Sequence, residues 1–378
     1  MDFGLNREQE LLVASAREFL SSESPASVVR RVAEDPAGAS PELERKIAAQ
    51  GWPGILIPEE YGGLGLELLD AAVLLIELGR ALTPSAFLSS GVVATSLLLA
   101  AASKPQKRLW LPRLASGEAT ATLAWLEESD RLDPPGVGLR ARRNRDSFRL
   151  RGNKLFVLSA QTADLFVVAV RTAAGVGERG VTLLLLPRDT PGLSVAPLES
   201  FDRTRRLFEL KFDDVVVPRS QILGTEGEGW KHLSRVLDVA AIAIAAESQG
   251  GSERALQMAV DYSHVREQFG RPIGSFQSLK HIAAECLADI EPSRSLVWYG
   301  AWAQSHAPRD ASRAASMVKA RLGDVYSRTT NCAVQMHGGI GFTWEHDIHF
   351  WFKRAKANEV LFGTPAFHRE RVAELSGW

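Results

Sequence analysis

The chain has 378 residues, 45% of them apolar and 24% charged, which is enough to bury sizeable hydrophobic cores. Its 44 Lys and Arg balance 45 Asp and Glu, so a net charge of -1 gives no reason to expect nucleic acid or an anionic membrane as partner. The two cysteines, Cys286 and Cys332, are too few for a disulfide framework and lack zinc spacing. This usage fits a reducing compartment.

The ends and apolar runs of the sequence indicate no export and no membrane insertion. Residues 1–4 lack a basic segment followed by an apolar run, and apolar stretches such as 97–102 are too short to cross a bilayer. We therefore expect no targeting signal, no membrane segment and a cytoplasmic location.

The first third of the chain, residues 1–117, has helical periodicity throughout. Asn6 followed three residues later by Gln9 predicts a capping box, and apolar spacing then carries a helix to about Leu20. Further helices are predicted over 41–50, 66–80, 91–102 and 105–115.

Short β-type runs replace this periodicity over residues 118–225. Pro/Gly-rich loops separate them, which predicts a middle β domain, either a barrel or a sandwich. The predicted strands are 149–158, 165–170, 181–186 and 207–217.

Helical periodicity returns over residues 226–378, and Pro292 should kink or divide the second of its helices. The order helical, β, helical predicts a multidomain α+β fold and argues against a doubly wound nucleotide-binding fold. The predicted helices are 230–265, 276–306, 311–337 and 347–361.

Residues 266–277, REQFGRPIGSFQ, join two of these helices and concentrate cations, aromatic rings and an amide. Arginine can donate paired hydrogen bonds to a pyrophosphate, an aromatic ring can cover an adenine or flavin, and an amide can read a nucleotide edge. The residues alone leave two readings open, ligand contact or an ordinary solvated turn.

This segment resembles the R-x-x-F-G-x-x-x-x-x-x-Q cofactor motif of the acyl-CoA dehydrogenase family. Residues 57–65, IPEEYGGLG, resemble the family's N-terminal signature, and residues 335–342, QMHGGIGF, its C-terminal glycine loop. The resemblance implies a helical domain, a β domain and a C-terminal four-helix bundle, with FAD as cofactor and an acyl-CoA thioester as substrate. It also implies a tetramer built as a dimer of dimers.

In such assemblies one subunit grips the adenylate and pyrophosphate end of its neighbour's FAD. Without the resemblance, a glycine-rich helix end is more often a plain C-cap. The positions that the resemblance assigns to FAD are Arg266, Phe269, Ile273, Gln277, Gln335, Gly338, Gly339 and Thr364.

The half of the FAD site that each subunit builds for itself departs from the family pattern. The flavin-facing threonine of the family corresponds to Leu158, and its aromatic neighbour is kept only as Phe156. Residues 126–133 stand where the family has a T-E-P-x-x-G-S-D loop, and the glycines and the first hydroxyl are lost.

The family's catalytic glutamate, in a Y-E-G-T segment, corresponds to Phe362, which cannot accept a proton. The family's alternative position, in the segment that corresponds to residues 237–241, holds alanine here. Glu359 and Glu247 are the nearby carboxylates, and each is either a relocated base or a partner in a salt bridge or cap.

Two other clusters have plainer readings. His346 and His349 lack a third ligand, so we expect no metal site. The arginines between residues 140 and 151 could meet a CoA phosphate or an acidic partner, but a solvated hairpin is the simpler reading.

Three functional hypotheses follow. The preferred one is a base-less subunit that completes the FAD site of a catalytic partner in a heterotetramer, within an enzyme that desaturates an acyl-CoA. The second is a self-sufficient homotetrameric FAD oxidoreductase with a relocated base. The third is a non-enzymatic acyl-CoA-binding or scaffold protein.

Overall fold

The computed structural model describes residues 4–378, so the first three residues, on which the absence of a targeting signal partly rested, lie outside the described part. The chain divides into two compact units. The helical unit comprises residues 4–34, 68–84 and 241–378, and the sheet unit comprises 35–67 and 85–240. Each combines segments far apart in sequence, and the three predicted domain boundaries stay a prediction.

The sheet unit contains two four-stranded sheets, with strand orders β1-β4-β5-β8 and β2-β3-β7-β6. One hydrophobic core joins them, with Phe166 and Leu184 from the first sheet and Phe148 and Phe212 from the second. The sandwich expectation is confirmed and the closed barrel is wrong. The strands are β1 Ala121–Ala124, β2 Ala141–Asn144, β3 Ser147–Leu158, β4 Leu165–Arg171, β5 Val181–Pro187, β6 Leu193–Leu198, β7 Leu207–Pro218 and β8 Ile222–Leu223.

One predicted helix of the sheet unit has a different geometry. The range 91–102 is split into a π-helix, Phe87–Ala94, and α5, Thr95–Ala101. The Thr95 main-chain N–H donates to the Ser90 carbonyl oxygen five residues earlier, which is π-helical spacing, and the Thr95 hydroxyl donates to the same oxygen at 2.8 Å. The other helices that lie wholly in this unit are α3 Pro41–Ala49 and α6 Lys104–Ala115.

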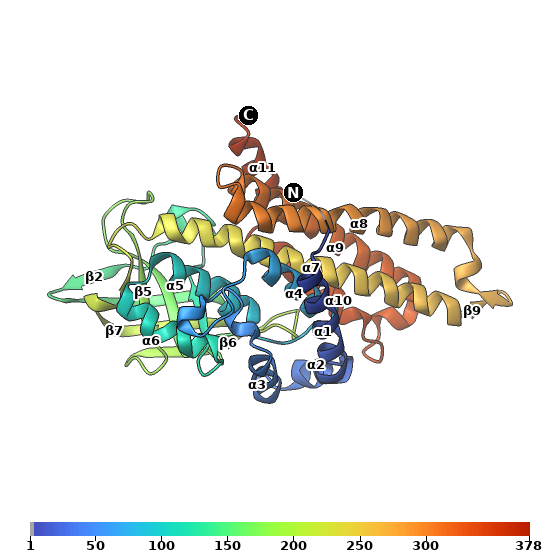
Figure 1. Ribbon diagram of the computed structural model, residues 1–378, viewed down its shortest axis with the longest axis horizontal. Coiled ribbons are helices and arrows are strands. Elements are labelled where there is room, and N and C mark those ends of the chain that lie inside the picture. Colours follow the sequence, from blue (N-terminus) through green and yellow to red (C-terminus); the bar gives the residue numbers. More distant parts are fainter. Residues whose placement is uncertain (1–3) are drawn as a thin grey trace. The chain divides into compact units, whose positions relative to one another are not determined.

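The helical unit contains both N-terminal and C-terminal helices (Figure 1). The capping box of Asn6 and Gln9 is confirmed, since each side chain accepts a hydrogen bond from the other residue's main-chain N–H. The helices are α1 Arg7–Glu23, α2 Ala26–Glu34, α4 Leu68–Arg80, the greater part of α7 Trp230–Val265, α8 Gln277–His306, α9 Ala311–His337, α10 Ile348–Val360 and α11 Pro365–Leu375.

α4 and α7 cross so closely that only glycine fits at the contact. A Cβ atom on Gly79 would lie 2.0 Å from the Glu247 carbonyl oxygen, and one on Gly250 would lie 1.7 Å from that of Ile76. A helix from the N-terminal part of the chain, α4, is thereby fixed against a C-terminal helix, α7.

Pro292 does not divide α8, which is one continuous helix, so that alternative of the prediction is wrong. Side chains satisfy carbonyl groups in the turn around the proline: the Ser293 hydroxyl donates to Asp289 O at 2.6 Å, and Gln249 Nε2 donates to Ile290 O at 3.2 Å. Both bonds lie in the turn that contains the proline and hold the helix there, although neither reaches Ala288, whose carbonyl oxygen loses the proline N–H as a donor. Among residues 4–378, no helix is both long enough and apolar enough to cross a membrane.

Candidate functional site

The segment between α7 and α8 folds as a two-residue β-hairpin. β9 (Glu267–Gln268) pairs with β10 (Arg271–Pro272), and Phe269 and Gly270 at the tip have φ of 55° and 74°, as a type I′ turn requires. Phe269 is 92% exposed. A bulky residue held in a left-handed conformation and turned to solvent contributes little to the packing of its own chain.

The base of the hairpin is rigid, while its polar side chains stay accessible. The Ile273 N–H donates to the Arg266 carbonyl oxygen at 2.8 Å, and the Ile273 side chain is buried. The side chains of Arg266 and Gln277 are exposed. Of the predicted FAD contacts here, Ile273 therefore acts as an anchor, and the others are free to meet a ligand.

The glycine loop after α9 is similarly open. Gly338 has a φ of 65° and ends the helix, which by itself explains a glycine there. Gly339 has no such φ, and a Cβ atom on it would meet nothing within 4 Å. Neither strain nor packing within this chain requires Gly339 to be glycine, so close approach from outside is the remaining physical reason.

Aromatic stacking brings the hairpin and the glycine loop to one end of the helical unit. Tyr262 lies four residues before Arg266, and its ring stacks on that of His337 with centroids 4.7 Å apart. The ring centroid of His346 is 4.4 Å from that of His337. His337 directly precedes Gly338. The two sequence motifs are therefore neighbours in space, and Figure 1 shows β9 at the far end of α8.

Thr364, in contrast, already has a local role. Its hydroxyl accepts a hydrogen bond from the Phe367 N–H at 3.2 Å and caps the N-terminus of α11. This bond explains the residue without a cofactor, and its assignment to FAD stays a prediction.

Phe362 lies in the turn between α10 and α11, half-buried and with a φ of 59°. Its carbonyl oxygen is 2.9 Å from His368 Nε2. Buried Lys319 donates from Nζ to the carbonyl oxygens of Gly363, at 2.6 Å, and Glu359, at 3.1 Å. The turn is therefore firmly held, and an apolar ring projects from it at the position of the family's base.

Both candidate replacement carboxylates are engaged in ion pairs. Glu247 lies 2.8 Å from Arg354 Nη1, with side chains 6% and 1% exposed. Glu359 accepts from the Ser327 hydroxyl at 3.1 Å and lies 3.3 Å from Lys356. Each carboxylate is already engaged by a cation and a neighbouring donor, so these contacts favour structural roles over relocated catalysis.

The sheet unit holds the residues that correspond to the flavin-facing half-site. Leu158 ends β3, its side chain is buried, and its carbonyl oxygen accepts from the Thr122 hydroxyl at 2.7 Å. Phe156 has a φ of 56° and is 39% exposed. The apolar Leu158 offers no hydroxyl where the family has one.

An ion pair pins the loop before β2 to β3. Lys154, fully buried, lies 2.5 Å from Glu127 and 3.0 Å from the Trp125 carbonyl oxygen. Burial lowers the pKa of Lys154 to about 8, although Glu127 raises it in part. This ion pair fixes the loop against β3.

Sequence reasoning missed one carboxyl group. Glu44 lies on α3 beside a small cavity lined by Phe87 and Ser90 of the π-helix, and it accepts from the Ala86 N–H at 2.7 Å. Burial raises the pKa of Glu44 to about 7, and the Ala86 hydrogen bond lowers it in part. A charged residue between buried Leu43 and Ile47 was the available signal.

Fold and site together define a flavoprotein of the acyl-CoA dehydrogenase type. Family models agree over nearly the whole chain: the N-terminal domain of acyl-CoA dehydrogenase matches residues 6–118, the middle domain 122–215 and the C-terminal domain 227–376. The chain belongs to the acyl-CoA dehydrogenase family. This membership confirms the resemblance inferred from the sequence. It also implies that FAD is the cofactor.

Individual relatives span the full chain. Acryloyl-CoA reductase (NADH) from Anaerotignum propionicum is 31% identical over 99% of this chain and 95% of its own length. The butyryl-CoA dehydrogenase structure from Megasphaera elsdenii has a TM-score of 0.93 at 28% identity and covers 100% of both chains. The Tcur3481-Tcur3483 steroid acyl-CoA dehydrogenase has a TM-score of 0.86 at 29% identity, with 98% of both chains covered.

The described residues fit the adenylate and pyrophosphate end of FAD better than the flavin end. An exposed Arg266, an exposed aromatic ring and a glycine with open space above it suit a phosphate-bearing ligand that approaches from outside. The residue that corresponds to the flavin-facing position is a buried leucine.

Proposed function

We propose that this chain is a subunit of a tetrameric acyl-CoA dehydrogenase, and that it completes the FAD site of a catalytic partner chain. The substrate is an acyl-CoA thioester, and the reaction is α,β-desaturation. The observation that carries the proposal is the side chain of Phe362, which takes the place of the family's base in a turn held by Lys319 and His368.

The chemistry explains why one residue matters so much. FAD supplies the acceptor for the hydride that leaves the β-carbon of the thioester, while a base must remove the α-proton. Phe362 has no lone pair for that proton. Glu247 and Glu359 are each held by a cation, so removing a proton would require breaking an existing ion pair.

The hairpin and glycine loop give the chain its role in the assembly. Arg266 would donate to the pyrophosphate of the partner's FAD, and Phe269 would cover its adenine. Gly338 and Gly339 would let the main chain approach the adenylate closely. These groups hold and orient the cofactor, and they move no proton.

The relatives support the two parts of the proposal differently. The butyryl-CoA dehydrogenase from Megasphaera elsdenii supports a thioester substrate and desaturation chemistry. The name of the Tcur3481-Tcur3483 steroid acyl-CoA dehydrogenase joins two components, which supports an assembly with a second chain.

The test is the visible spectrum and FAD content of the purified full-length chain, followed by titration with FAD. A colourless chain that takes up no FAD in excess supports the proposal. Binding near one FAD per chain would overturn it and favour the self-sufficient enzyme. In that case Glu359→Gln and Glu247→Gln, assayed for bleaching by acyl-CoA thioesters, identify which carboxylate acts as base.

A matched pair of variants tests the missing base in the isolated chain with added FAD. Phe362→Glu introduces a carboxylate and Phe362→Gln an amide of equal size without basicity. The proposal predicts that Phe362→Glu gives no bleaching in the isolated chain with added FAD, because the flavin half-site is also incomplete. Bleaching by Phe362→Glu but not by Phe362→Gln would show that only the base is missing.

A further inference from the structure

Four arginines at alternating positions lie on the outward side of β2 and β3, with Arg140 one residue before β2 begins. The register places Arg142 directly opposite Arg149. Side chains two residues apart on a strand share a face, so Arg140 joins Arg142 and Arg151 joins Arg149. The intervening Ala141 and Leu150 point into the hydrophobic core.

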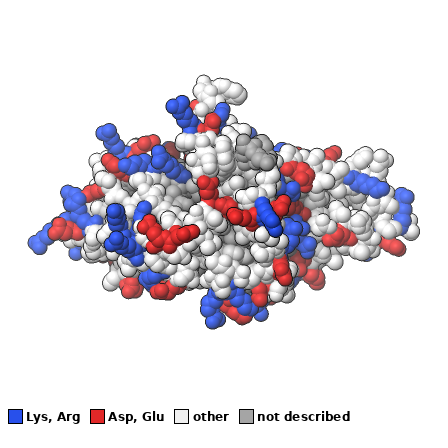
Figure 2. Space-filling view, viewed as in Figure 1, with Lys and Arg blue, Asp and Glu red and all other residues white. Residues whose placement is uncertain are grey.

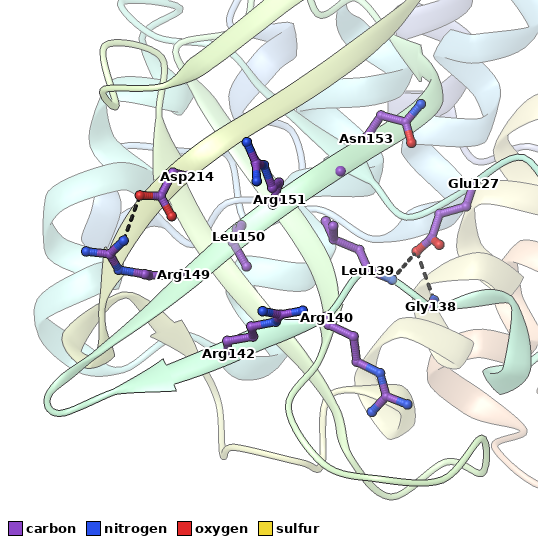
Figure 3. Close-up of a pocket in the computed structure, with 11 residues that line it drawn as sticks. Glu127, Gly138, Leu139, Arg140, Arg142, Arg149, Leu150, Arg151, Asn153 and Asp214 are labelled. Atoms are coloured by element: carbon purple, nitrogen blue, oxygen red, sulfur yellow. Dashed lines mark hydrogen bonds and ion pairs between the residues drawn. The ribbon is translucent and has the colours of Figure 1, made fainter.

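These arginines line an open pocket of about 600 Å³ on the sheet unit. Figure 3 shows them on two neighbouring strands around the pocket, with Arg149 turned to Asp214 and Glu127 turned to the main chain of Gly138 and Leu139. Figure 2 shows Lys and Arg side chains gathered at the left end of the view, where Figure 1 places β2.

Carboxylates do not balance the charge of the pocket. Asp214 pairs with Arg149 at 2.7 Å. Glu127 is the other acid in the lining, and its negative charge is already compensated by the ion pair with Lys154. It also accepts hydrogen bonds from the N–H groups of Gly138 and Leu139. The pocket therefore keeps a net positive charge.

The remaining three guanidinium groups are weakly engaged. Arg140 donates to the carbonyl oxygen of Ala173 at 2.8 Å, which leaves its charge uncompensated. Arg151 approaches Asp213 only to 3.7 Å, with both side chains 84% exposed. Within residues 4–378, no carboxylate pairs with Arg142.

Arginines beside the pocket differ from those that line it. Arg143 and Arg219 share Glu226 at 3.0 and 2.8 Å. Like charges directly across a strand pair are destabilising, and a solvated hairpin gains nothing from Arg142 opposite Arg149. An anion held between the strands turns that repulsion into attraction.

We propose that this pocket binds a ligand that carries two or more phosphate groups. The concave shape favours a small molecule over a flat protein surface. Several guanidinium groups on one face suit the fork-like hydrogen bonding of phosphate oxygens. The inference stands apart from the proposed function, because it needs neither FAD nor catalysis.

Calorimetric titration of the full chain with inorganic pyrophosphate, at low and high salt, tests this site. We expect binding that weakens with salt and a loss of roughly tenfold in affinity for each of Arg142→Gln and Arg151→Gln. Asp214→Asn should bind more tightly, since it removes the carboxylate that pairs most closely with a pocket arginine. Asn is tolerated at the φ of 55° found there.

Arg145→Gln is the matched control, since Arg145 lies at the tip of the same hairpin, is exposed, and does not line the pocket. Affinity for pyrophosphate should be unchanged in this variant. Absence of pyrophosphate binding at low salt would overturn the proposal. Equal losses in Arg145→Gln and Arg142→Gln would overturn it as well, because they indicate only a diffuse surface charge.

Two further titrations identify the source of the phosphates, using CoA with 3′-dephospho-CoA, and ADP. If Arg142→Gln weakens CoA and removes its preference over 3′-dephospho-CoA, the pocket holds the substrate's own phosphates. If it weakens ADP and pyrophosphate but leaves CoA unchanged, the pocket is a separate nucleotide site. Both results support a phosphate site, and neither depends on the outcome of the FAD titration.

Discussion

The ammonium group of Lys319 lies 2.6 Å from the carbonyl oxygen of Gly363, so a buried cation on α9 holds the turn that carries Phe362. The same group reaches the Glu359 carbonyl oxygen at 3.1 Å, and Lys319 is 1% exposed. Burial lowers the pKa of Lys319 to about 7, against the raising influence of Glu359 and Asp324. The hydrogen bonds from Lys319 therefore stabilise this turn. Losing them would leave buried carbonyl groups without a donor, which is costly away from water.

Replacing Lys319 by methionine should destabilise the chain by about 2–3 kcal/mol, because two buried carbonyl groups lose their donor. Urea unfolding of the variant measures the change. Lys356→Met is the control: its ion pair with Glu359 is partly exposed and should contribute at most about 1 kcal/mol. Equal effects of the two substitutions would contradict a special role for Lys319.

Glu44 should make stability depend on pH. Its folded pKa of about 7 lies above the ordinary 4.5, so between these values the native state holds more protons than the unfolded state. The stability contributed by the protonated group is fully present below pH 4.5 and is lost as the pH rises through 7.

Glu44→Gln should therefore be more stable than the parent chain at pH 8, by about 1–3 kcal/mol, and no more stable at pH 4.5. The amide oxygen can still accept from the Ala86 N–H. Thermal unfolding across this range measures the difference, with Glu42→Gln on the exposed face of the same helix as control. A constant offset at all pH values would rule out titration of Glu44 as the cause.

The buried pair of Glu247 and Arg354 should show strong coupling. Arg354→Met leaves a buried carboxylate without its cation and should cost about 3–5 kcal/mol. The double variant Arg354→Met/Glu247→Gln should recover at least about 1 kcal/mol of that loss, because the stranded charge is gone. Denaturant unfolding of both single variants and the double variant gives the coupling, and simple additivity would argue against a direct ion pair.

Phe269 should matter for FAD and not for folding. Its ring is 92% exposed, so Phe269→Ala should change stability by less than about 0.5 kcal/mol. In an oligomer that contains FAD, the same variant should release the cofactor roughly tenfold more readily, because the adenine loses its cover. Phe201→Ala, at a residue 63% exposed in the sheet unit, is the control and should leave FAD retention unchanged.

The sequence by itself determined the long elements and the family. The bounds of α7 and α9 were predicted to the residue, since a helical period repeated over many turns leaves little ambiguity. The short edge strands β1, β6 and β8 were missed, because two to six residues carry too little periodicity, and β2 was anticipated only as one arm of a solvated hairpin. α2 and α11 were missed as well.

The partners of individual side chains needed the tertiary structure. The sequence showed that Phe362 replaces the family's base. It did not show that Glu247 forms an ion pair with Arg354, which lies 107 residues further along the chain. The enclosure of Glu44 and the exposure of Phe269 also depend on which elements pack over them. Helical periodicity depends on residues that are close together in the sequence, so it can be recognised there. Burial and ion pairing depend on segments that are distant in sequence and come into contact only when the chain folds.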